Sequence, residues 1–210
     1  MITIIHGKRE AAHAELLDSM FADRKTLFVD LLGWDIPSHD GRHEVDEFDH
    51  DGTVYIVATD GKSAHQGSLR LLPTVRSHLL DTHFASLCAG GAPADAATYE
   101  VTRLCLPSRL GAKRRLLVRN ELIAAMVDHA LAAGIKRLVG VTNVGFRKEI
   151  LAMGWLAEPL GPEGQLSGAR LGAFALHIGP DTPERLSWSG IYPVERLANP
   201  VRTRTAGARS

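Results

Sequence analysis

The feature that most constrains the fold is the order in which strand-like and helical segments follow one another. Apolar and β-branched runs predict strands at 2–5, 53–58, 68–72, 99–106, 135–142 and 174–178. The turn-rich sequence DGKSAHQG separates the second of these strands from the third, as in a hairpin. Helical segments alternate with the other strands, which favours an α/β protein with one central, mixed and twisted sheet and helices on both faces.

Three segments repeat apolar residues at three- and four-residue steps, as the buried side of a helix does. The predicted helices cover residues 9–28, 116–133 and 146–153. Gly33 and Pro37 follow the first helix, and Gly134 and Gly154 end the other two. Residues 34–51 carry seven acids among turn residues, so we expect a loop between the first helix and the middle strands.

The length of 210 residues suits a single domain. We expect that domain to span residues 1–198. Residues 199–210 read NPVRTRTAGARS, with three arginines and almost no apolar content, so they are predicted to form a disordered basic tail.

The charge balance and the cysteine count exclude several classes of function. Lysine plus arginine and aspartate plus glutamate are 24 each, and this neutral balance disfavours bulk nucleic-acid binding. Cys88 and Cys105 match no metal-binding spacing and no HExxH occurs, so we expect no metal site. No apolar run approaches the roughly 18 residues of a membrane span, and we expect a soluble cytoplasmic protein.

Three charged residues interrupt segments that are otherwise strand-like. Arg70 lies within SLRLLP, and Glu100 and Arg103 lie within YEVTRLCL. Buried charges are costly unless they are paired, so these residues lie either on a solvated sheet face or in a cleft where opposite charges meet. Glu100 and Arg103 differ in parity along the strand, so both can face one cleft only if the strand carries a bulge.

Aromatic and acidic residues upstream are candidates for the same cleft. Arg24 lies four residues before Phe28, and Trp34 follows the first helix. Asp46 and Asp49 are three residues apart in the acidic loop. Taken singly, the rings could be core residues and the acids ordinary loop residues.

Taken together, these residues resemble those of the LuxI-type acyl-homoserine-lactone synthases, the autoinducer synthase family. The matching pattern is R-x-x-x-F-x-x-x-x-x-W, then D-x-x-D, then an arginine in GSLRLLPT, then YEVTRL. The resemblance runs from Arg24 to Arg103 and, more weakly, to Trp155. It implies an N-acetyltransferase-like (GNAT) fold whose fourth strand carries a bulge, which would bring Glu100 and Arg103 into one cleft.

The resemblance also implies an activity. A family member transfers an acyl group from a carrier thioester to the α-amine of S-adenosylmethionine and then closes a lactone. The products are methylthioadenosine and a quorum-sensing signal. S-adenosylmethionine and the thioester are substrates, so no cofactor is expected.

S-adenosylmethionine offers an adenine face, a sulfonium and an amino-acid zwitterion for recognition. Phe28 and Trp34 suit stacking and cation–π attraction, which contribute roughly 0.5–2 kcal/mol each. Asp46 and Asp49 would pair with the ammonium or the sulfonium, and an arginine would hold the α-carboxylate through two parallel hydrogen bonds. The arginine candidates are Arg24, Arg70 and Arg103. Residue type alone leaves open which of them binds substrate and which pairs with an acid.

Acyl transfer requires a base, because a free α-amino group has a pKa of roughly 7.7–8.0 and is mostly protonated at neutral pH. Glu100 is the first candidate for this base, with Asp46 or Asp49 second. Backbone N–H groups at the bulge, together with Arg103, would stabilise the tetrahedral oxyanion. The amine attacks directly, so no serine or cysteine nucleophile is needed.

The acyl chain needs an apolar pocket, which the second half of the chain can supply. The residues expected to line it are Met126, Val141, Thr142, Phe146, Leu151 and Trp155. Ordinary core packing is the alternative for each of them. The Thr142 hydroxyl could bind a 3-oxo group or only the strand. Val139 and Gly140 just before it are not polar, which weakens the case for a 3-oxo preference.

An acidic acyl carrier protein would dock on a basic surface. The candidates are Lys113, Arg114, Arg115, Arg147 and Lys148, and a solvated helix face is the alternative reading. Acyl-CoA is the other possible donor, but the run PSRLGAKRR falls short of a glycine-rich pyrophosphate loop, which favours the carrier protein.

Two other functions compete with this one. An acetyl-CoA-dependent N-acetyltransferase for small molecules would share the fold but would not need the Phe28, Trp34, Asp46 and Asp49 set. A non-catalytic binding module would have no use for an intact Glu100.

Overall fold

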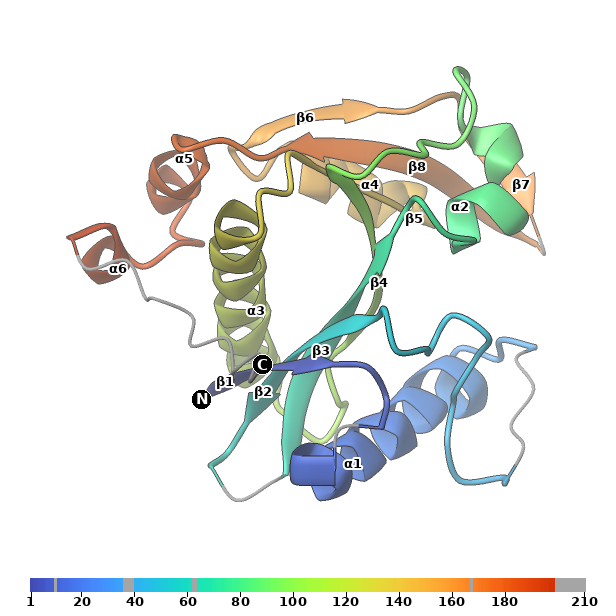
Figure 1. Ribbon diagram of the computed structural model, residues 1–210, viewed down its shortest axis with the longest axis vertical. Coiled ribbons are helices and arrows are strands. Elements are labelled where there is room, and N and C mark those ends of the chain that lie inside the picture. Colours follow the sequence, from blue (N-terminus) through green and yellow to red (C-terminus); the bar gives the residue numbers. More distant parts are fainter. Residues whose placement is uncertain (10, 36–39, 62–63, 167, 199–210) are drawn as a thin grey trace, which may run out of the picture.

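The computed structural model describes residues 1–9, 11–35, 40–61, 64–166 and 168–198 (Figure 1). Over these residues the chain forms one open eight-stranded sheet in the order β1-β2-β3-β4-β5-β8-β6, and β7 also pairs with β8. The predicted tail at 199–210 lies outside the described residues.

All neighbouring strands are antiparallel except β4 and β5, which are parallel. The strands are β1 (Ile2–His6), β2 (Val54–Thr59), β3 (His65–Pro73), β4 (Thr98–Cys105), β5 (Arg137–Asn143), β6 (Leu156–Pro159), β7 (Gly164–Leu166) and β8 (Ala169–His177). Strands β6 and β7 were not predicted, because they are short and have little apolar character. The predicted start of β8 is five residues late, because the first part of this strand, ARLGA, contains two alanines and a glycine, which have low strand propensity.

The predicted first helix covers three elements in the structure, of which the first is the short 3₁₀ helix η1 (Ala11–His13). An α-helix, α1 (Ala14–Arg24), continues directly into a π-helix, η2 (Lys25–Leu31). The other helices are α2 (Leu79–Thr82), η3 (Ala85–Leu87), α3 (Ala112–Ala132), α4 (Val144–Leu151), α5 (Thr182–Trp188) and α6 (Val194–Ala198). A π-turn widens the helix, and such turns are frequent at functional sites.

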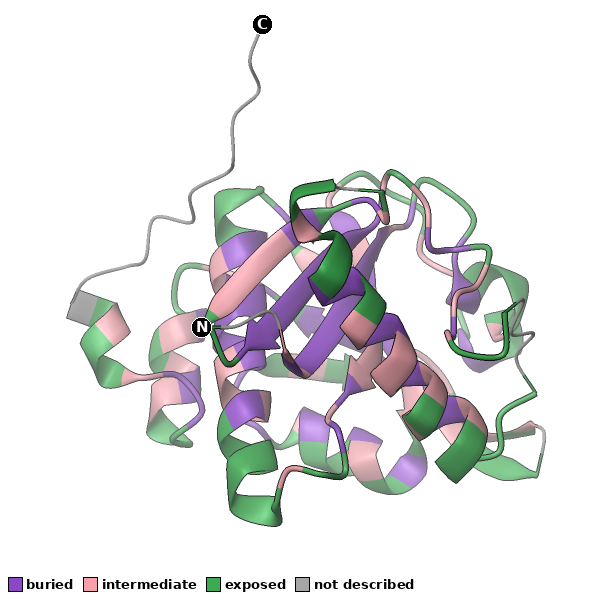
Figure 2. Cartoon of the chain, turned by 90° about the horizontal axis from the view of Figure 1, so that it is seen from below, coloured by how far each residue is buried: buried purple, intermediate pink, exposed green. Residues whose placement is uncertain are grey.

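The helices pack on both faces of the sheet, as predicted. α3 and α4 cover one face, where residues such as Ile56, Leu71, Leu122 and Phe174 form the main apolar core. On the other face α1 packs against Tyr55 and Val57, and α2 and η3 pack further along the sheet. Figure 2 shows that the strands beneath these helices are buried while the outer helix surfaces are exposed.

The middle of the sheet is irregular in two ways. β4 and β5 pair only over Thr98–Glu100 and Arg137–Val139. Opposite β3, the register of β4 shifts between the partners of Ser68 and Arg70. At this bulge Arg103 has a φ of +52°, in the left-handed region. The bulge that the resemblance implied is therefore present, and it removes the parity conflict between Glu100 and Arg103.

Candidate active site

The side chain of Arg24 projects from α1 toward the sheet, and the residue is 1% exposed. Its Nε donates to Glu44 at 2.5 Å, and its two terminal nitrogens donate to Asp49 at 2.9 Å each. The Tyr55 hydroxyl also donates to Asp49. Burial alone would raise the pKa of Asp49, but the charges of Arg24 and Arg70 outweigh it and hold that pKa well below its usual range.

Arg70 and Arg103 meet at Asp46. Arg70 donates to both Asp46 oxygens at 2.6 and 3.0 Å and to the Thr102 hydroxyl at 2.9 Å. Arg103 donates to Asp46 at 2.6 Å and to Glu44 at 3.1 Å. Within the described chain, Nη1 of Arg103 has no protein hydrogen-bond partner. Because Nε and Nη2 both donate to acids, this single terminal nitrogen is the part of the guanidinium left without a protein partner among the described residues.

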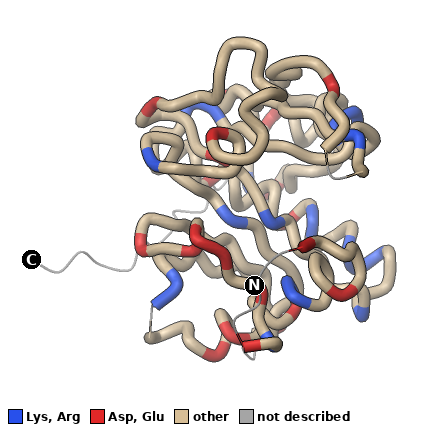
Figure 3. Tube along the Cα trace, turned by 90° about the vertical axis from the view of Figure 1, so that its right-hand side faces the viewer, with Lys and Arg blue, Asp and Glu red and all other residues tan. Residues whose placement is uncertain are grey.

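Three arginines and three acids thus form one continuous ion-pair cluster beneath α1 and the acidic loop. The arginines were all expected, but of the acids only Asp46 and Asp49 were. Glu44 is fully buried and joins Arg24 to Arg103. Nothing in the sequence distinguishes it from the other loop acids. Elsewhere, basic and acidic segments are interspersed over the chain, without a continuous region of one sign in the view of Figure 3.

The two predicted rings form an aromatic wall beside this cluster. Phe28 and Trp34 stack with their centroids 4.7 Å apart and their planes tilted by 23°. The guanidinium of Arg103 lies 5.6 Å from each centroid. Phe28 is buried and Trp34 is 44% exposed, so the wall opens to solvent at Trp34.

Glu100 is on the same sheet face but outside the ion-pair cluster. Its carboxylate accepts the backbone N–H groups of Leu79 and Leu80, at the start of α2, at 2.7 and 3.0 Å. Burial, which outweighs these hydrogen bonds and the nearby charges of Arg70 and Arg103, raises the pKa of Glu100 to about 7. Of the six charged residues that were candidates for one cleft, five therefore belong to the ion-pair cluster and Glu100 lies outside it on the same face.

The predicted acyl-pocket residues are divided between the two faces of the sheet. Met126 and Trp155 are buried in the core under α3 and α4, and Phe146 and Leu151 pack against it. By strand alternation, the side chain of Thr142 points to the same face of the sheet as these residues. Val141 points the other way and packs with the cluster that contains Leu80 and Leu87, so it does not join the other residues.

The predicted docking residues are mostly exposed, with one exception. Lys113, Arg114 and Arg115 are exposed near the start of α3, as is Lys148 on α4. Arg147 is only 7% exposed and donates to Glu163 at 2.9 Å. Successive helix residues point about 100° apart, so Lys148 faces solvent while Arg147 faces the sheet. The expectation that Arg147 belongs to a docking surface is wrong.

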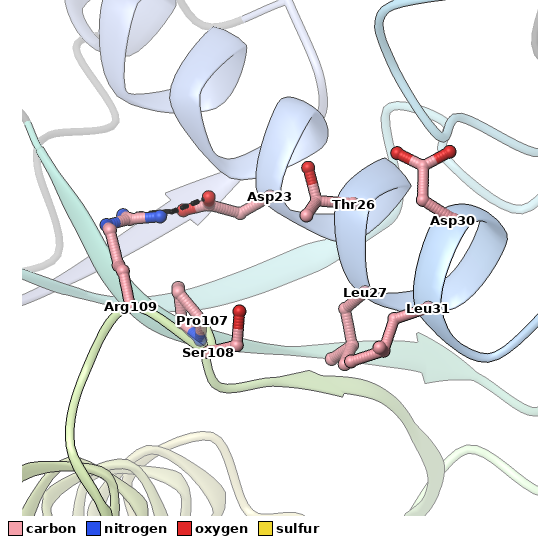
Figure 4. Close-up of a pocket in the computed structure, with 8 residues that line it drawn as sticks. All are labelled: Asp23, Thr26, Leu27, Asp30, Leu31, Pro107, Ser108 and Arg109. Atoms are coloured by element: carbon pink, nitrogen blue, oxygen red, sulfur yellow. Dashed lines mark hydrogen bonds and ion pairs between the residues drawn. The ribbon is translucent and has the colours of Figure 1, made fainter.

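A cavity of about 360 Å³ lies between the α1–η2 segment and the loop after β4 (Figure 4). Its lining residues are Asp23, Thr26, Leu27, Asp30, Leu31, Pro107, Ser108 and Arg109. Asp23 and Arg109 are paired with each other in its wall. None of the residues predicted for the site lines this cavity, although Leu27 is the chain neighbour of Phe28.

Two further observations concern metals and membranes. No group of three or more His, Cys, Asp and Glu side chains in the described residues is arranged to hold a metal ion. None of the helices in that part of the chain combines the length and the apolar composition needed to cross a membrane.

The chain is similar to known autoinducer synthases. The family model for autoinducer synthases matches residues 8–178. An acyl-homoserine-lactone synthase of Ralstonia nicotianae is 36% identical over 198 residues, which are 90% of this chain and 95% of the relative.

Two of the solved structures that share the fold illustrate the likeness. One is BjaI, a CoA-dependent acyl-homoserine lactone synthase solved with SAM and isopentyl-CoA. Its TM-score is 0.81 at 26% identity, over 95% of this chain and 90% of BjaI. The other is TofI, in a ternary complex with an inhibitor and MTA. Its TM-score is 0.75 at 29% identity, over 89% of this chain and 96% of TofI. The N-acetyltransferase-like fold is therefore confirmed, and the chain belongs to the autoinducer synthase family.

Proposed function

We propose that the chain is an acyl-homoserine-lactone synthase that acylates the α-amine of S-adenosylmethionine and closes the lactone with release of methylthioadenosine. The observation that carries this proposal is the grouping of features at the β4 bulge. A neutral cluster of buried ion pairs, an aromatic wall and a carboxyl of raised pKa lie on one face of the sheet.

The hydrogen bonds indicate that the three arginines have different roles. Both ends of the Arg24 guanidinium are bound by Glu44 and Asp49, so Arg24 holds the site together. Arg70 is held in the same way by Asp46 and Thr102. Arg103 lies against both rings and keeps Nη1 free of protein partners within the described residues. It is therefore our candidate to bind the substrate carboxylate or the oxyanion.

Glu100 is the best candidate for the general base. A carboxyl with a pKa of about 7 can accept a proton from an ammonium whose pKa is roughly 7.7–8.0 at little cost. Each of its oxygens accepts one backbone N–H and retains another lone pair. Asp49 is a poor base because two arginines stabilise its charge, and Asp46 is engaged by Arg70 and Arg103. We assign Asp46 and Asp49 to holding the arginines and to pairing with the substrate cation.

The second step, closure of the lactone, depends more on how the substrate is positioned than on acid–base catalysis. The substrate's own carboxylate attacks its γ-carbon, and the neutral thioether leaves from the sulfonium. The buried, mutually paired arginines form a rigid wall that can hold the amino-acid chain folded for this attack, an effect of up to roughly 7–11 kcal/mol.

For the acyl donor we propose an acyl thioester carried by an acidic carrier protein. Its support is the exposed group Lys113, Arg114 and Arg115 at the start of α3. BjaI is CoA-dependent, so acyl-CoA is the alternative donor. We propose that the reaction takes place in the cytoplasm, where both substrates would be available.

The decisive test incubates the purified chain with S-adenosylmethionine and a panel of acyl thioesters, and follows methylthioadenosine release and lactone mass. We expect methylthioadenosine to appear only when both substrates are present, and S-adenosylmethionine alone to raise the melting temperature. Acetylation of a small amine by acetyl-CoA without S-adenosylmethionine would instead identify a conventional N-acetyltransferase.

A further inference from the structure

The two N–H groups that hold Glu100 belong to a helix with little stability of its own. Helix α2 has four residues, and the N–H groups of Leu79 and Leu80 donate to the Glu100 carboxylate. Isolated helices this short do not persist in water. The position of the two donors is therefore set by the segments against which α2 and the residues after it pack.

Helix α2 and the 3₁₀ helix after it form one hydrogen-bonded unit. The Phe84 N–H donates to the Leu79 carbonyl at 3.2 Å, and the Leu87 N–H donates to the Phe84 carbonyl at 2.9 Å. We call residues 79–89 the α2–η3 unit. Because its parts are bonded to one another, a displacement at η3 also moves the N–H groups of α2.

A loop from the edge of the sheet touches this unit backbone to backbone. In the β6–β7 loop, residues 160–163, the Leu160 carbonyl accepts the Ala89 N–H at 2.9 Å. A Cβ added at Gly161 would overlap the carbonyl oxygen of Leu87 and would lie 2.8 Å from the backbone nitrogen of Ala89. Backbone atoms cannot turn aside as the end of a side chain can. A side chain at Gly161 would therefore push the α2–η3 unit away.

The opposite side of the loop is held by a buried cation that the mechanism above does not use. Arg147 projects from α4, and its Nη2 donates to Glu163 at 2.9 Å. Its Nη1 makes a longer contact of 3.4 Å with the Gly161 carbonyl. The guanidinium lies against Gly172 on β8, where an added Cβ would be 2.5 Å from Cζ. The loop is thus fixed between α4 and η3.

We infer that Gly161 is a positioning residue for the proposed base, because the β6–β7 loop supports the α2–η3 unit and so keeps the two N–H groups of α2 against Glu100. This inference rests on the proposed function. Protein interiors are close-packed and transmit strain, so a shift of Leu87 and Ala89 reaches α2. The hydrogen bonds to Glu100 have nearly ideal lengths of 2.7 and 3.0 Å, so a shift in any direction weakens them.

The variant Gly161→Ala tests this role through the pH dependence of the reaction. Hydrogen bonds from N–H groups stabilise the ionised carboxylate, so weakening them raises the pKa of Glu100 further. The midpoint of the acidic limb of kcat/KM should therefore move upward by about 0.5–1 pH unit. A merely structural defect would lower the rate equally at every pH and leave the midpoint in place.

The matched control is Gly90→Ala, one residue beyond the α2–η3 unit. An added Cβ at Gly90 meets nothing within 4 Å, and neither Gly90 nor Gly161 has a positive φ, so alanine suits both backbones. The control should keep the wild-type midpoint. An unchanged midpoint in folded Gly161→Ala, or equal shifts in both variants, would overturn the inference, while methylthioadenosine release by the wild type would still support the proposed function. A wild-type chain that releases none would count against that function itself.

If Gly161→Ala does not fold, Glu163→Gln decides, because it loosens the hold of Arg147 on the loop without adding bulk. Removing an acid lowers the pKa of another acid by charge alone, so an upward shift of the midpoint can come only from the loosened loop. We expect an upward shift of at least about 0.2 pH unit. Glu158→Gln, which removes an exposed acid from β6, reports the charge effect by itself. A midpoint in Glu163→Gln that equals the wild-type value or lies below it would refute the assignment.

Discussion

The face of the sheet beneath α1 carries three arginines and three acids that are buried or partly buried, whereas the face beneath α3 and α4 is mostly apolar. The charged face holds desolvated groups whose mutual attraction roughly balances the cost of removing them from water. The apolar face has no such cost and provides the burial on which stability depends. The charged face thus carries the groups proposed to react, and the apolar face stabilises the fold. Substitutions on the two faces should therefore affect the protein in different ways.

The largest expected effect on the reactive side is loss of turnover without loss of fold. Glu100→Gln keeps the shape of the side chain but removes the base, and turnover should fall by roughly 10²–10⁴-fold while S-adenosylmethionine binding changes little. Steady-state kinetics and calorimetric titration would separate the two quantities. Glu158→Gln, an exposed acid on β6, is the control. Equal losses of binding and turnover would remove Glu100 from the base role.

The next prediction concerns how much the ion pairs of the charged cluster contribute to the stability of the fold. Arg24→Met would leave Glu44 and Asp49 buried without their main partner, which should lower the free energy of unfolding by about 3–5 kcal/mol. Lys25→Met removes the neighbouring exposed pair with Asp30 and should cost at most about 1 kcal/mol. Chemical denaturation of both variants measures the difference. Similar values would mean that burial does not distinguish these two ion pairs.

Measurements over a range of pH test the role of Glu100 on the charged face without a mutation. Because Glu100 must be ionised to act, and its pKa is about 7, kcat/KM should fall about tenfold per pH unit below neutrality. For stability the sign is opposite. The fold raises this pKa from 4.5, so the contribution of protonated Glu100 is fully present below about 4.5 and is lost as the pH rises through 7. A flat kcat/KM profile between pH 5.5 and 7 would contradict the role of Glu100 as the base.

The aromatic wall should affect affinity more than turnover. Trp34→Ala removes one ring from beside Arg103, and the apparent KM for S-adenosylmethionine should rise by roughly 2–30-fold. Trp188→Ala is the matched control, since Trp188 is 74% exposed on α5. An unchanged KM in Trp34→Ala would exclude the ring from the binding pocket.

The smallest effect concerns the outer surface of the apolar side. Charge reversal at Arg114 and Arg115 should slow the reaction with acyl carrier protein a few-fold at low salt and less at high salt, because exposed charges are screened. Kinetics at two ionic strengths, with acyl-CoA as the parallel donor, would test this. A loss that does not depend on salt would place the carrier elsewhere.

Periodicity and resemblance predicted much of this fold and site, for reasons that can be located in single residues. The long runs that became α3, β2 and β4 show clear helical or strand periods, so they were recognisable. Helix α2, with four residues, shows no period, yet its backbone N–H groups hold Glu100. Glu44 is one of seven acids in a single loop, and only the folded loop selects it as the link between Arg24 and Arg103.

The prediction for Arg147 failed for a related reason. Two consecutive basic residues, Arg147 and Lys148, are typical of an exposed surface, but helix α4 directs the first of them toward the sheet. Gly172, against which the guanidinium lies, is 25 positions further along the chain. Residue types and spacing thus predict which groups are present, whereas contacts between distant segments decide how each group is used.

The left-handed backbone at Arg103 has a consequence for how this protein can change. An L-residue in that conformation costs roughly 1–2 kcal/mol, which glycine would recover. Glycine would also remove the guanidinium that touches Glu44, Asp46 and both rings. Relief of backbone strain and loss of ion pairs therefore oppose each other at this single position, because removing one partner of a buried pair is itself strongly destabilising.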